Sequence, residues 1–166
     1  MALMTDELKA WIGREASYTS PEELGRASIR YFALALNDPN PLYKDEAFAR
    51  GTRHGGIIAH PTFVCETLQY MDRQPDELGY IGHAWPLPVP PGTRLIRGGN
   101  DYEFHQAVRP DDRITATWRI ADIYERTTRT GEMLFIISEV RYTNQRGELL
   151  ATNRETNIIQ RVGGGT

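Results

Sequence analysis

Paired cysteines and long apolar runs are both missing from this sequence. Its single cysteine, Cys65, excludes an internal disulfide and fits a reducing compartment, most simply the cytoplasm. No stretch approaches the roughly 20 apolar residues that a membrane helix needs, and the N-terminus lacks the basic and apolar regions of a signal peptide. We therefore expect a cytoplasmic protein with no membrane partner.

An excess of basic charge is missing as well. The chain has 19 Lys and Arg residues against 22 Asp and Glu residues, a formal net charge of -3, and no basic run. Binding to nucleic acid needs a basic patch that neutralises phosphates, so we expect no nucleic acid partner. His54, His83 and His105 show no spacing typical of metal ligands, and we predict no metal site.

The size and composition describe one globular domain. The chain has 166 residues, of which 40% are hydrophobic, enough to bury a core. No repeat or linker divides it. We expect a single domain over residues 1–162 and a flexible, glycine-rich tail over residues 163–166.

Helix signals dominate the first part of the chain. Ser20, Pro21 and Glu23 have the arrangement of a helix N-terminus: a cap, a first-turn proline and a capping-box acid. Apolar residues then recur with a helical period until Pro39 ends the helix. These residues are Ile29, Phe32, Ala33 and Leu36. Residues 37–43, NDPNPLY, are therefore expected to form a loop that leaves a packed helix.

A second helical region follows. Residues 44–50 can form one or two turns, and residues 51–56 contain two adjacent glycines and predict another loop. Residues 57–71, IIAHPTFVCETLQYM, place Pro61 where a first-turn proline belongs and have a broad apolar face. They predict a buried helix. The proline-rich residues 74–98 predict a long loop, of the kind that often serves as a lid or tunnel wall.

The last third of the sequence changes to the period of strands. Tyr102, Phe104 and Val108 are expected on one strand face, and a second strand alternates cleanly. The apolar residues of that second strand are Ile114, Ala116, Trp118 and Ile120. Ile123 then breaks the parity, which predicts a bulge near residues 121–122.

Two further strands complete the pattern. The apolar run 133–137 predicts a central strand, residues 144–147 a turn, and residues 149–159 a last strand. Helices first and antiparallel strands afterwards indicate an α+β fold.

Three ordered motifs resemble those of a known family. They are FALALNDPNPLY at 32–43, GGIIAHPTF at 55–63, and GGNDYEFH at 98–105 followed by VRPDDR at 108–113. The chain resembles the MaoC-like hydratase/dehydratase family, in particular its N-terminal-type (FAS1-like dehydratase) branch. The resemblance implies a hot-dog fold, in which a curved antiparallel sheet wraps a long central helix.

The resemblance also implies a reaction and its partners. The substrate would be a thioester of coenzyme A or acyl carrier protein, and the reaction a reversible, (R)-specific addition of water to a trans-2-enoyl thioester. No metal or redox cofactor is implied. The expected assembly is a homodimer, or a heteromer with a second MaoC-like subunit.

Hydration of an enoyl thioester needs an acid, a base and donors for the developing enolate oxygen. Active members of the family carry the pattern D-x-N-P-L-H. Asp38 and Asn40 match it, but Tyr43 stands at the histidine position, and a phenol with an ordinary pKa of about 10 is a poor base. Pro61 replaces the helix-start glycine and has no N–H, whereas Thr62 still has one.

Each of these residues also has a plainer interpretation. Asp38 can be a turn residue after a helix, Asn40 a brace of the loop, and Tyr43 a packed aromatic side chain. His60 can be a buried, hydrogen-bonded histidine or a substitute base. Arg53 can meet coenzyme A phosphates or remain a solvated surface charge.

We predict Asp38, Tyr43 and His60 as catalytic candidates. The predicted substrate-binding residues are Asn40, Gly56, Thr62 and Arg53. The favoured function is the acyl-binding, catalytically degenerate half of a heteromeric hydratase/dehydratase, with little activity of the chain alone. One alternative is an autonomous homodimeric hydratase that uses Asp38 with His60 or Tyr43. Another is a non-enzymatic acyl-thioester-binding protein, and a hot-dog thioesterase is the weakest rival.

Overall fold

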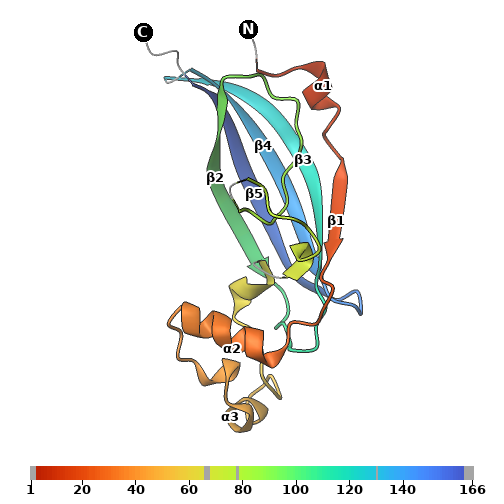
Figure 1. The fold of residues 1–166 in the computed structure, drawn as a ribbon, viewed down its shortest axis with the longest axis vertical. Coiled ribbons are helices and arrows are strands. Elements are labelled where there is room, and N and C mark those ends of the chain that lie inside the picture. The colour runs from red at the N-terminus through yellow and green to blue at the C-terminus, as the bar shows by residue number, and fades with distance from the viewer. Residues whose placement is uncertain (1–2, 66–67, 78, 130, 163–166) are drawn as a thin grey trace.

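One antiparallel sheet organises the molecule (Figure 1). The structure is a computed structural model that describes residues 3–65, 68–77, 79–129 and 131–162. Its five strands lie in the order β1-β3-β4-β5-β2. Their bounds are Glu15–Thr19 (β1), Thr93–Phe104 (β2), Thr115–Thr128 (β3), Gly131–Thr143 (β4) and Leu149–Arg161 (β5). The α+β class predicted from the sequence is confirmed.

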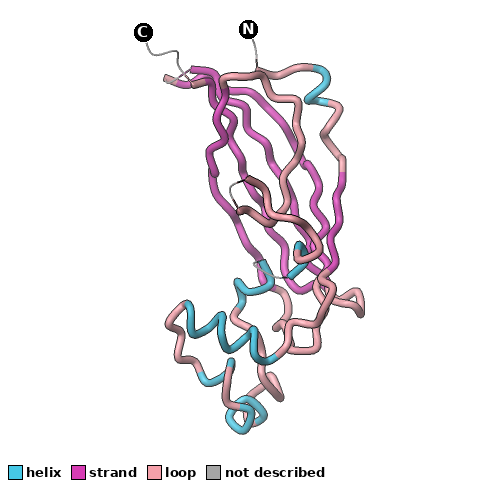
Figure 2. The backbone as a smooth tube through the Cα atoms, in the orientation of Figure 1, coloured by secondary structure: helices cyan, strands magenta, loops and turns pink. Residues whose placement is uncertain are grey.

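The helical elements are short and gather mostly at one end of the sheet. They are α1 (Asp6–Lys9), α2 (Arg26–Ala35), α3 (Glu46–Arg50) and the 3-10 turns η1 (Pro41–Tyr43), η2 (Pro61–Cys65) and η3 (Leu68–Tyr70). Figures 1 and 2 show α2 and α3 beyond one end of the strands and both chain termini at the other. They also show the segment between η3 and β2, residues 71–92, running along one face of the sheet.

The alternation predicted for β3 is confirmed. Ile114, Ala116, Trp118 and Ile120 are all buried. The register with β4 shifts between Ile120 and Asp122, so the bulge lies where the parity break predicted it. β4, which holds the continuous apolar run, is the middle strand of the sheet. Both of its edges are therefore paired, as expected for a strand apolar over several consecutive residues.

The interior contains two apolar clusters. The larger, which we call the helical-end core, joins Ile29 and Ala33 of α2 to Ala116, Val140 and other strand residues. The smaller, the terminal-end core, consists of Leu3, Leu8, Ile120, Ile123, Leu134, Ile136 and Ile159. Trp85, from the segment 71–92, packs against both. Burial of this apolar area is the main term that stabilises the fold.

The predicted start of the first long helix is wrong. α2 begins at Arg26, and its N-cap is Gly25 with φ 74°, not Ser20. The Ser20 hydroxyl instead donates to the Glu22 carbonyl. The chain is held out of the helix at this point because the Leu24 and Gly25 N–H groups donate to the carbonyls of Asp112 and Pro110. Tertiary hydrogen bonds have overridden a local capping signal.

The long helix predicted over residues 57–71 is not found in the described residues. Residues 57–60 have no regular secondary structure, and the N–H groups of Ile58 and Ala59 donate to the carbonyls of Leu42 and Val108. The 3-10 turns η2 and η3 follow. Thr62 and Val64 are β-branched and lose side-chain freedom in a helix, which leaves short 3-10 turns as the competing local structure.

Two strand boundaries also differ from prediction. β2 begins at Thr93, inside the predicted loop 74–98, and ends at Phe104, so Val108 lies outside it although it is buried. The short edge strand β1 and the helix α1 were not predicted at all. The predicted helix at residues 44–50 and the turn at 144–147 are confirmed.

The tail 163–166 lies outside the described residues. Across the described part of the chain, no helix has the length and apolarity needed to cross a membrane.

Candidate active site

The loop that carries Asp38 is set by the way α2 ends. Asn37 has φ 54°, in the left-handed region that asparagine tolerates better than most residues. Its N–H donates to the Leu34 carbonyl at 3.0 Å, and the Asp38 N–H donates to the Ala33 carbonyl at 2.9 Å. These two bonds form a Schellman motif, which satisfies the last carbonyls of the helix. Asp38 is therefore the first residue after a fixed turn.

Asp38 and Asn40 brace the loop that follows. The Asn40 N–H donates to Asp38 Oδ1 at 3.0 Å, and Asn40 Oδ1 accepts from the Leu42 N–H at 3.1 Å. The second bond caps η1. Asn40 thus has the bracing role that the sequence allowed. Asp38 uses one carboxylate oxygen for the loop and keeps the other for a neighbour.

That neighbour is His60. The hydrogen bonds of Ile58 to Leu42 and of Ala59 to Val108 bring the segment before His60 against the loop. His60 Nε2 lies 3.8 Å from Asp38 Oδ2, and the two side chains are 22% and 30% exposed. This separation exceeds a direct hydrogen bond, but it leaves the two groups facing one another at a partly open position.

Thr62 occupies the other nitrogen of the His60 ring. Its N–H lies 3.3 Å and its hydroxyl 2.9 Å from His60 Nδ1. The Thr62 N–H is therefore not free for an oxyanion, contrary to the expectation from the sequence. Because Nδ1 accepts this backbone N–H, a neutral His60 ring carries its proton on Nε2, toward Asp38.

Tyr43 is buried behind the pair. It is 6% exposed, and its ring meets the edge of the His60 ring with centroids 5.7 Å apart. Burial, followed by the nearby Asp38 charge, raises the pKa of the Tyr43 phenol above its ordinary value of 10.0. Tyr43 therefore keeps its proton near neutral pH and can donate a hydrogen bond, but it cannot act as a base.

The structure places Gly56 and Arg53 elsewhere. Gly56 is buried and lines a separate hollow of about 460 Å³ with Arg26, Glu46 and Arg109. Arg53 is exposed, and its Nε lies 3.4 Å from His54 Nε2. Among the described residues, no group of three or more His, Cys, Asp or Glu side chains is placed to hold a metal ion.

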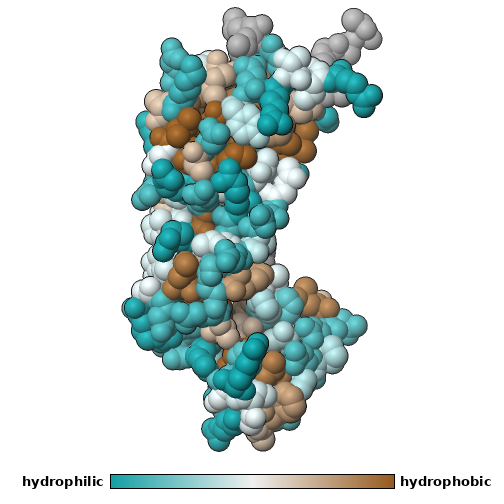
Figure 3. Space-filling model, turned by 180° about the vertical axis from the view of Figure 1, so that it is seen from behind, coloured by the Kyte–Doolittle hydropathy of each residue, from teal (hydrophilic) through white to brown (hydrophobic). Residues whose placement is uncertain are grey.

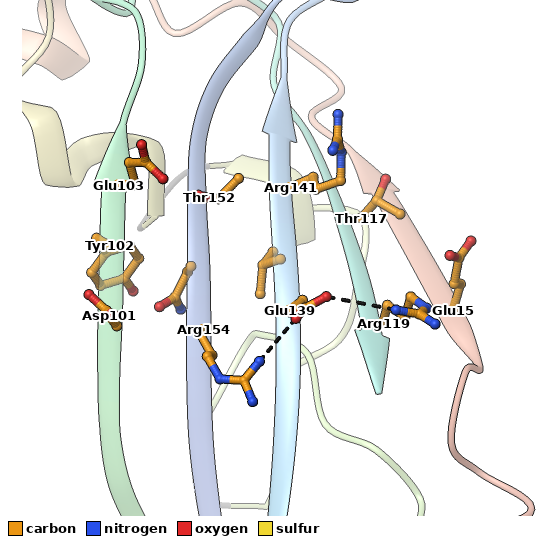
Figure 4. Close-up of a pocket in the computed structure, with 12 residues that line it drawn as sticks. Glu15, Asp101, Tyr102, Glu103, Thr117, Arg119, Glu139, Arg141, Thr152 and Arg154 are labelled. Atoms are coloured by element: carbon orange, nitrogen blue, oxygen red, sulfur yellow. Dashed lines mark hydrogen bonds and ion pairs between the residues drawn. The ribbon is translucent and has the colours of Figure 1, made fainter. Parts of the chain in front are cut away.

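Another hollow lies away from this loop, on the face of the sheet that we call the outer face (Figure 4). It has a volume of about 580 Å³ and is lined by residues of all five strands, among them Thr117, Arg119 and Arg141. Glu139 pairs there with Arg119 at 3.7 Å and Arg154 at 3.0 Å. Figure 3, seen from behind, shows mainly hydrophilic residues over the middle of the molecule. We interpret this hollow as a solvated charged surface.

Two partly open cavities lie on the opposite, inner face of the sheet, under the segment 71–92. They have volumes of about 360 and 180 Å³, and both are lined by Tyr80, His83, Arg97 and Glu155. Trp85 anchors the segment through a hydrogen bond from its Nε1 to Ser138 Oγ at 3.0 Å. Sequence reasoning missed this site. The strand period places Glu155 on the same face as Asn153. An acidic residue on a core-facing side of a strand is unusual, and it was the sequence feature that could have indicated this site.

Known proteins resemble this chain in sequence. Residues 10–153 match the family described as FAS1-like, dehydratase domain region. A UPF0336 protein of Streptomyces avermitilis is 32% identical over 115 residues, which cover 69% of this chain and 72% of the relative. A protein of Thermomonospora curvata named "Probable enoyl-CoA hydratase alpha subunit" is 30% identical over 163 residues. That match covers 89% of this chain but 49% of the relative, so the chain spans about half of its length.

Solved structures share the architecture. The MaoC-like dehydratase from Rhodospirillum rubrum matches with a TM-score of 0.66 at 20% identity, over 92% of this chain and 94% of that one. A chain of the ChsH1-ChsH2 complex from Mycobacterium tuberculosis matches with a TM-score of 0.70 at 20% identity, over 90% of this chain and 85% of that one. The chain therefore belongs to the FAS1-like dehydratase domain family, with the hot-dog fold of the MaoC-like hydratases and dehydratases.

Proposed function

We propose that this chain is the acyl-binding half of a heteromeric (R)-specific enoyl-thioester hydratase, equally a 3-hydroxyacyl-thioester dehydratase. A second MaoC-like subunit would supply the catalytic Asp/His pair. One observation carries the proposal: a buried Tyr43, held protonated, stands at the position where the family pattern has its histidine. The relative named an alpha subunit and the two-component ChsH1-ChsH2 complex support a heteromeric assembly.

The chemistry of hydration also supports an acyl-binding role for this chain. A base must take a proton from water near neutral pH, and the Tyr43 phenol stays protonated there. A donor must meet the enolate oxygen, but Pro61 has no N–H and the Thr62 N–H is already bonded to His60. The partly open cavities beneath segment 71–92 have space for an acyl chain. This chain is thus better equipped to bind an acyl group than to hydrate it.

A second candidate rests on a different observation. His60 and Asp38 face one another at 3.8 Å, which is a carboxylate–imidazole pair assembled from two loops of the same chain. Closure by less than an ångström would bring the two groups within hydrogen-bond distance. In this autonomous hydratase the Asp38 carboxylate would take the proton of water, and the His60 Nε2–H would orient that water.

Hydration of crotonyl-coenzyme A, followed by loss of enoyl absorbance, tests both candidates. We expect no turnover from the folded chain alone, and turnover on addition of a MaoC-like subunit that carries D-x-N-P-L-H. The complex should then tolerate His60→Gln in this chain, because the catalytic pair lies in its partner. Asp122→Asn, an exposed carboxylate change on β3, is the matched control for Asp38→Asn.

Other outcomes identify the alternatives. Turnover by the chain alone that falls by at least about a hundredfold in Asp38→Asn and His60→Gln, but not in Asp122→Asn, would contradict the heteromer and establish the autonomous hydratase. Binding of acyl-coenzyme A without turnover, with the partner present, would indicate a non-enzymatic binding protein. Release of free thiol from acyl-coenzyme A would indicate a thioesterase.

A further inference from the structure

A band of polar side chains crosses the inner face of the sheet between the two apolar cores. Asn100 of β2 and Ser138 of β4 both lie opposite Glu155 of β5 in the register. Asn153, two residues before Glu155, lies on the same face. Ser138 is 1% exposed and Asn153 is 3% exposed. We call these four residues the polar band. Polar groups at such depth destabilise the fold unless they are hydrogen-bonded.

Most of the polar band is satisfied. The Asn153 Nδ2 group donates to Asn100 Oδ1 at 2.8 Å, and Ser138 Oγ accepts from Trp85 Nε1 at 3.0 Å. Glu155 Oε2 accepts from Asn157 Nδ2 at 3.0 Å. Asn153 Oδ1 is the exception, because it is buried and has no hydrogen-bond partner among the described residues. Outside the polar band, His83 Nε2 is also buried and has no hydrogen-bond partner among them. Buried atoms of this kind are rare in native proteins and call for an explanation.

The His83 ring is held in one orientation. Its Nδ1 lies 2.9 Å from the Tyr18 hydroxyl, and its ring packs against Trp85 and Trp118 with centroids 4.2 and 4.6 Å away. Burial, with a smaller effect from the Arg73 charge, lowers the pKa of His83 to about 4. The ring is neutral near pH 7. When the Tyr18 hydroxyl donates to Nδ1, the ring proton lies on Nε2, and that unpaired atom is a donor.

Both exceptional residues line the same cavity. His83 and Asn153 line the cavity of about 180 Å³, which we call the polar cavity. Liquid water occupies roughly 30 Å³ per molecule, so the cavity exceeds the space of one water. It shares His83 and Glu155 with the neighbouring cavity of about 360 Å³, the apolar cavity. The apolar cavity is lined further by Trp85, Leu87, Val89, Leu95, Ile136 and Ile159.

The two cavities adjoin one another. Tyr80, His83, Arg97 and Glu155 line both of them. An acyl chain that occupies the apolar cavity would therefore pass beside the polar cavity. The unpaired donor and the unpaired acceptor lie where they can meet a polar group carried along such a chain.

We propose that the polar cavity binds a hydroxyl group carried in the middle of the acyl chain, an inference that rests on the proposed acyl-binding function. His83 Nε2–H donates to the hydroxyl oxygen, and the hydroxyl proton is donated to Asn153 Oδ1. A hydroxyl supplies one acceptor and one donor, which is the complement that the two buried atoms lack. The rest of the chain lies in the apolar cavity. The substrate class is thus a mid-chain hydroxyacyl thioester.

Binding of matched ligands to the purified chain tests this inference without turnover. The probes are decanoyl-coenzyme A, its mid-chain hydroxylated form and its terminally hydroxylated form. Calorimetry measures affinity, and the fluorescence of Trp85 and Trp118 reports occupancy beside the cavities. We expect the mid-chain hydroxyl form to bind at least about fivefold more tightly than the other two, as two added hydrogen bonds predict.

Variants assign the preference to the polar cavity. Asn153→Leu should abolish the preference while decanoyl-coenzyme A still binds. His83→Phe, which keeps a ring against Trp118 but removes the donor, should reduce the preference. Thr152→Val is the matched control on the same strand, because its side chain lines the hollow on the outer face; it should leave the preference intact.

The contrary outcomes are distinct from those of the proposed function. Equal affinity for the three probes, or an unchanged preference in Asn153→Leu, would overturn the inference and mean that water satisfies both atoms. Failure of all three probes to bind would overturn it as well. The crotonyl assay with a partner subunit decides the proposed function separately, since it measures turnover of a four-carbon chain that carries no mid-chain hydroxyl.

Discussion

At the scale of single residues, the surroundings of Tyr43 fix its protonation. The Tyr43 phenol is buried beside the Asp38 carboxylate, and both effects keep its proton in place. His60 is partly exposed, and its Nε2 lies 3.8 Å from Asp38 Oδ2. Replacement of a histidine by tyrosine in the family pattern therefore does more than change the size of a side chain, because it removes the group that titrates near neutral pH.

His83 provides a prediction at the same scale. Burial lowers the pKa of His83 from 6.5 to about 4. Between these two pH values, His83 is protonated in the unfolded chain but neutral in the folded chain. The stability associated with His83 is complete above about pH 6.5 and decreases as the pH falls toward 4. Between about pH 7 and pH 5 the free energy of unfolding should decrease by about 2 kcal/mol from this group.

Urea unfolding at the two pH values measures this effect. His83→Phe should lose most of the difference that His83 causes, whereas the exposed control His105→Gln should retain it. An identical pH dependence in His83→Phe and the parent chain would contradict the buried, neutral state of the His83 ring.

At the scale of elements, one segment connects the loops of the candidate site to the rest of the fold. Residues 108–113 accept hydrogen bonds from Leu24 and Gly25 before α2 and from Ala59 before His60. The buried Asp112 carboxylate in turn accepts from Asn144 and Arg146 of the turn after β4. The third motif of the family resemblance thus has a structural role. It sets where α2 starts and where His60 lies.

The end of α2 gives a prediction for an element boundary. Asn37 lies at φ 54°, where a β-branched side chain is strained and glycine is not. Asn37→Val should decrease the free energy of unfolding by about 1–3 kcal/mol, and Asn37→Gly should change it by less than about 0.5 kcal/mol. Urea denaturation of the two variants compares them. Equal stability of Asn37→Val and the parent would mean that the Schellman turn does not constrain the loop.

At the scale of the whole molecule, the segment 71–92 joins two cores that the sheet alone would leave open. Trp85 packs against both the helical-end and terminal-end cores, meets Trp11 edge to face at 6.4 Å, and donates to Ser138. The segment therefore covers the two cores and contributes residues to the lining of both cavities. Loss of its anchor should affect stability and ligand binding together.

Trp85→Ala tests the role of this cover. We expect a decrease in the free energy of unfolding of about 2–4 kcal/mol, because a large aromatic side chain is removed from two clusters. Trp85→Phe keeps most of the packing and loses the hydrogen bond to Ser138, so about 1 kcal/mol is expected. Thermal and urea unfolding measure both. A loss below about 1 kcal/mol in Trp85→Ala would show that segment 71–92 is not needed to close the cores.

Much of the fold could be predicted from the sequence, and the failures have a common cause. The β3 alternation, the bulge before Asp122 and the central place of β4 follow from local period and are confirmed. The capping signal at Ser20 and the apolar segment 57–71 were overridden by hydrogen bonds from distant residues, namely Asp112, Pro110, Leu42 and Val108. Local propensity is a weak prior where long-range partners compete for the same backbone groups.

The sequence by itself determined the class of fold, because periodicity is a property of neighbouring residues. Its three ordered motifs carried the family resemblance, and the resemblance in turn marked Tyr43 as standing at the histidine position of the family pattern. Tertiary structure alone decided that His60 faces Asp38, that the Thr62 N–H is occupied, and that His83 and Asn153 line one cavity. These pairs are brought together by sheet register and by loops that cross it. Their chemistry depends on burial, which no single stretch of sequence specifies.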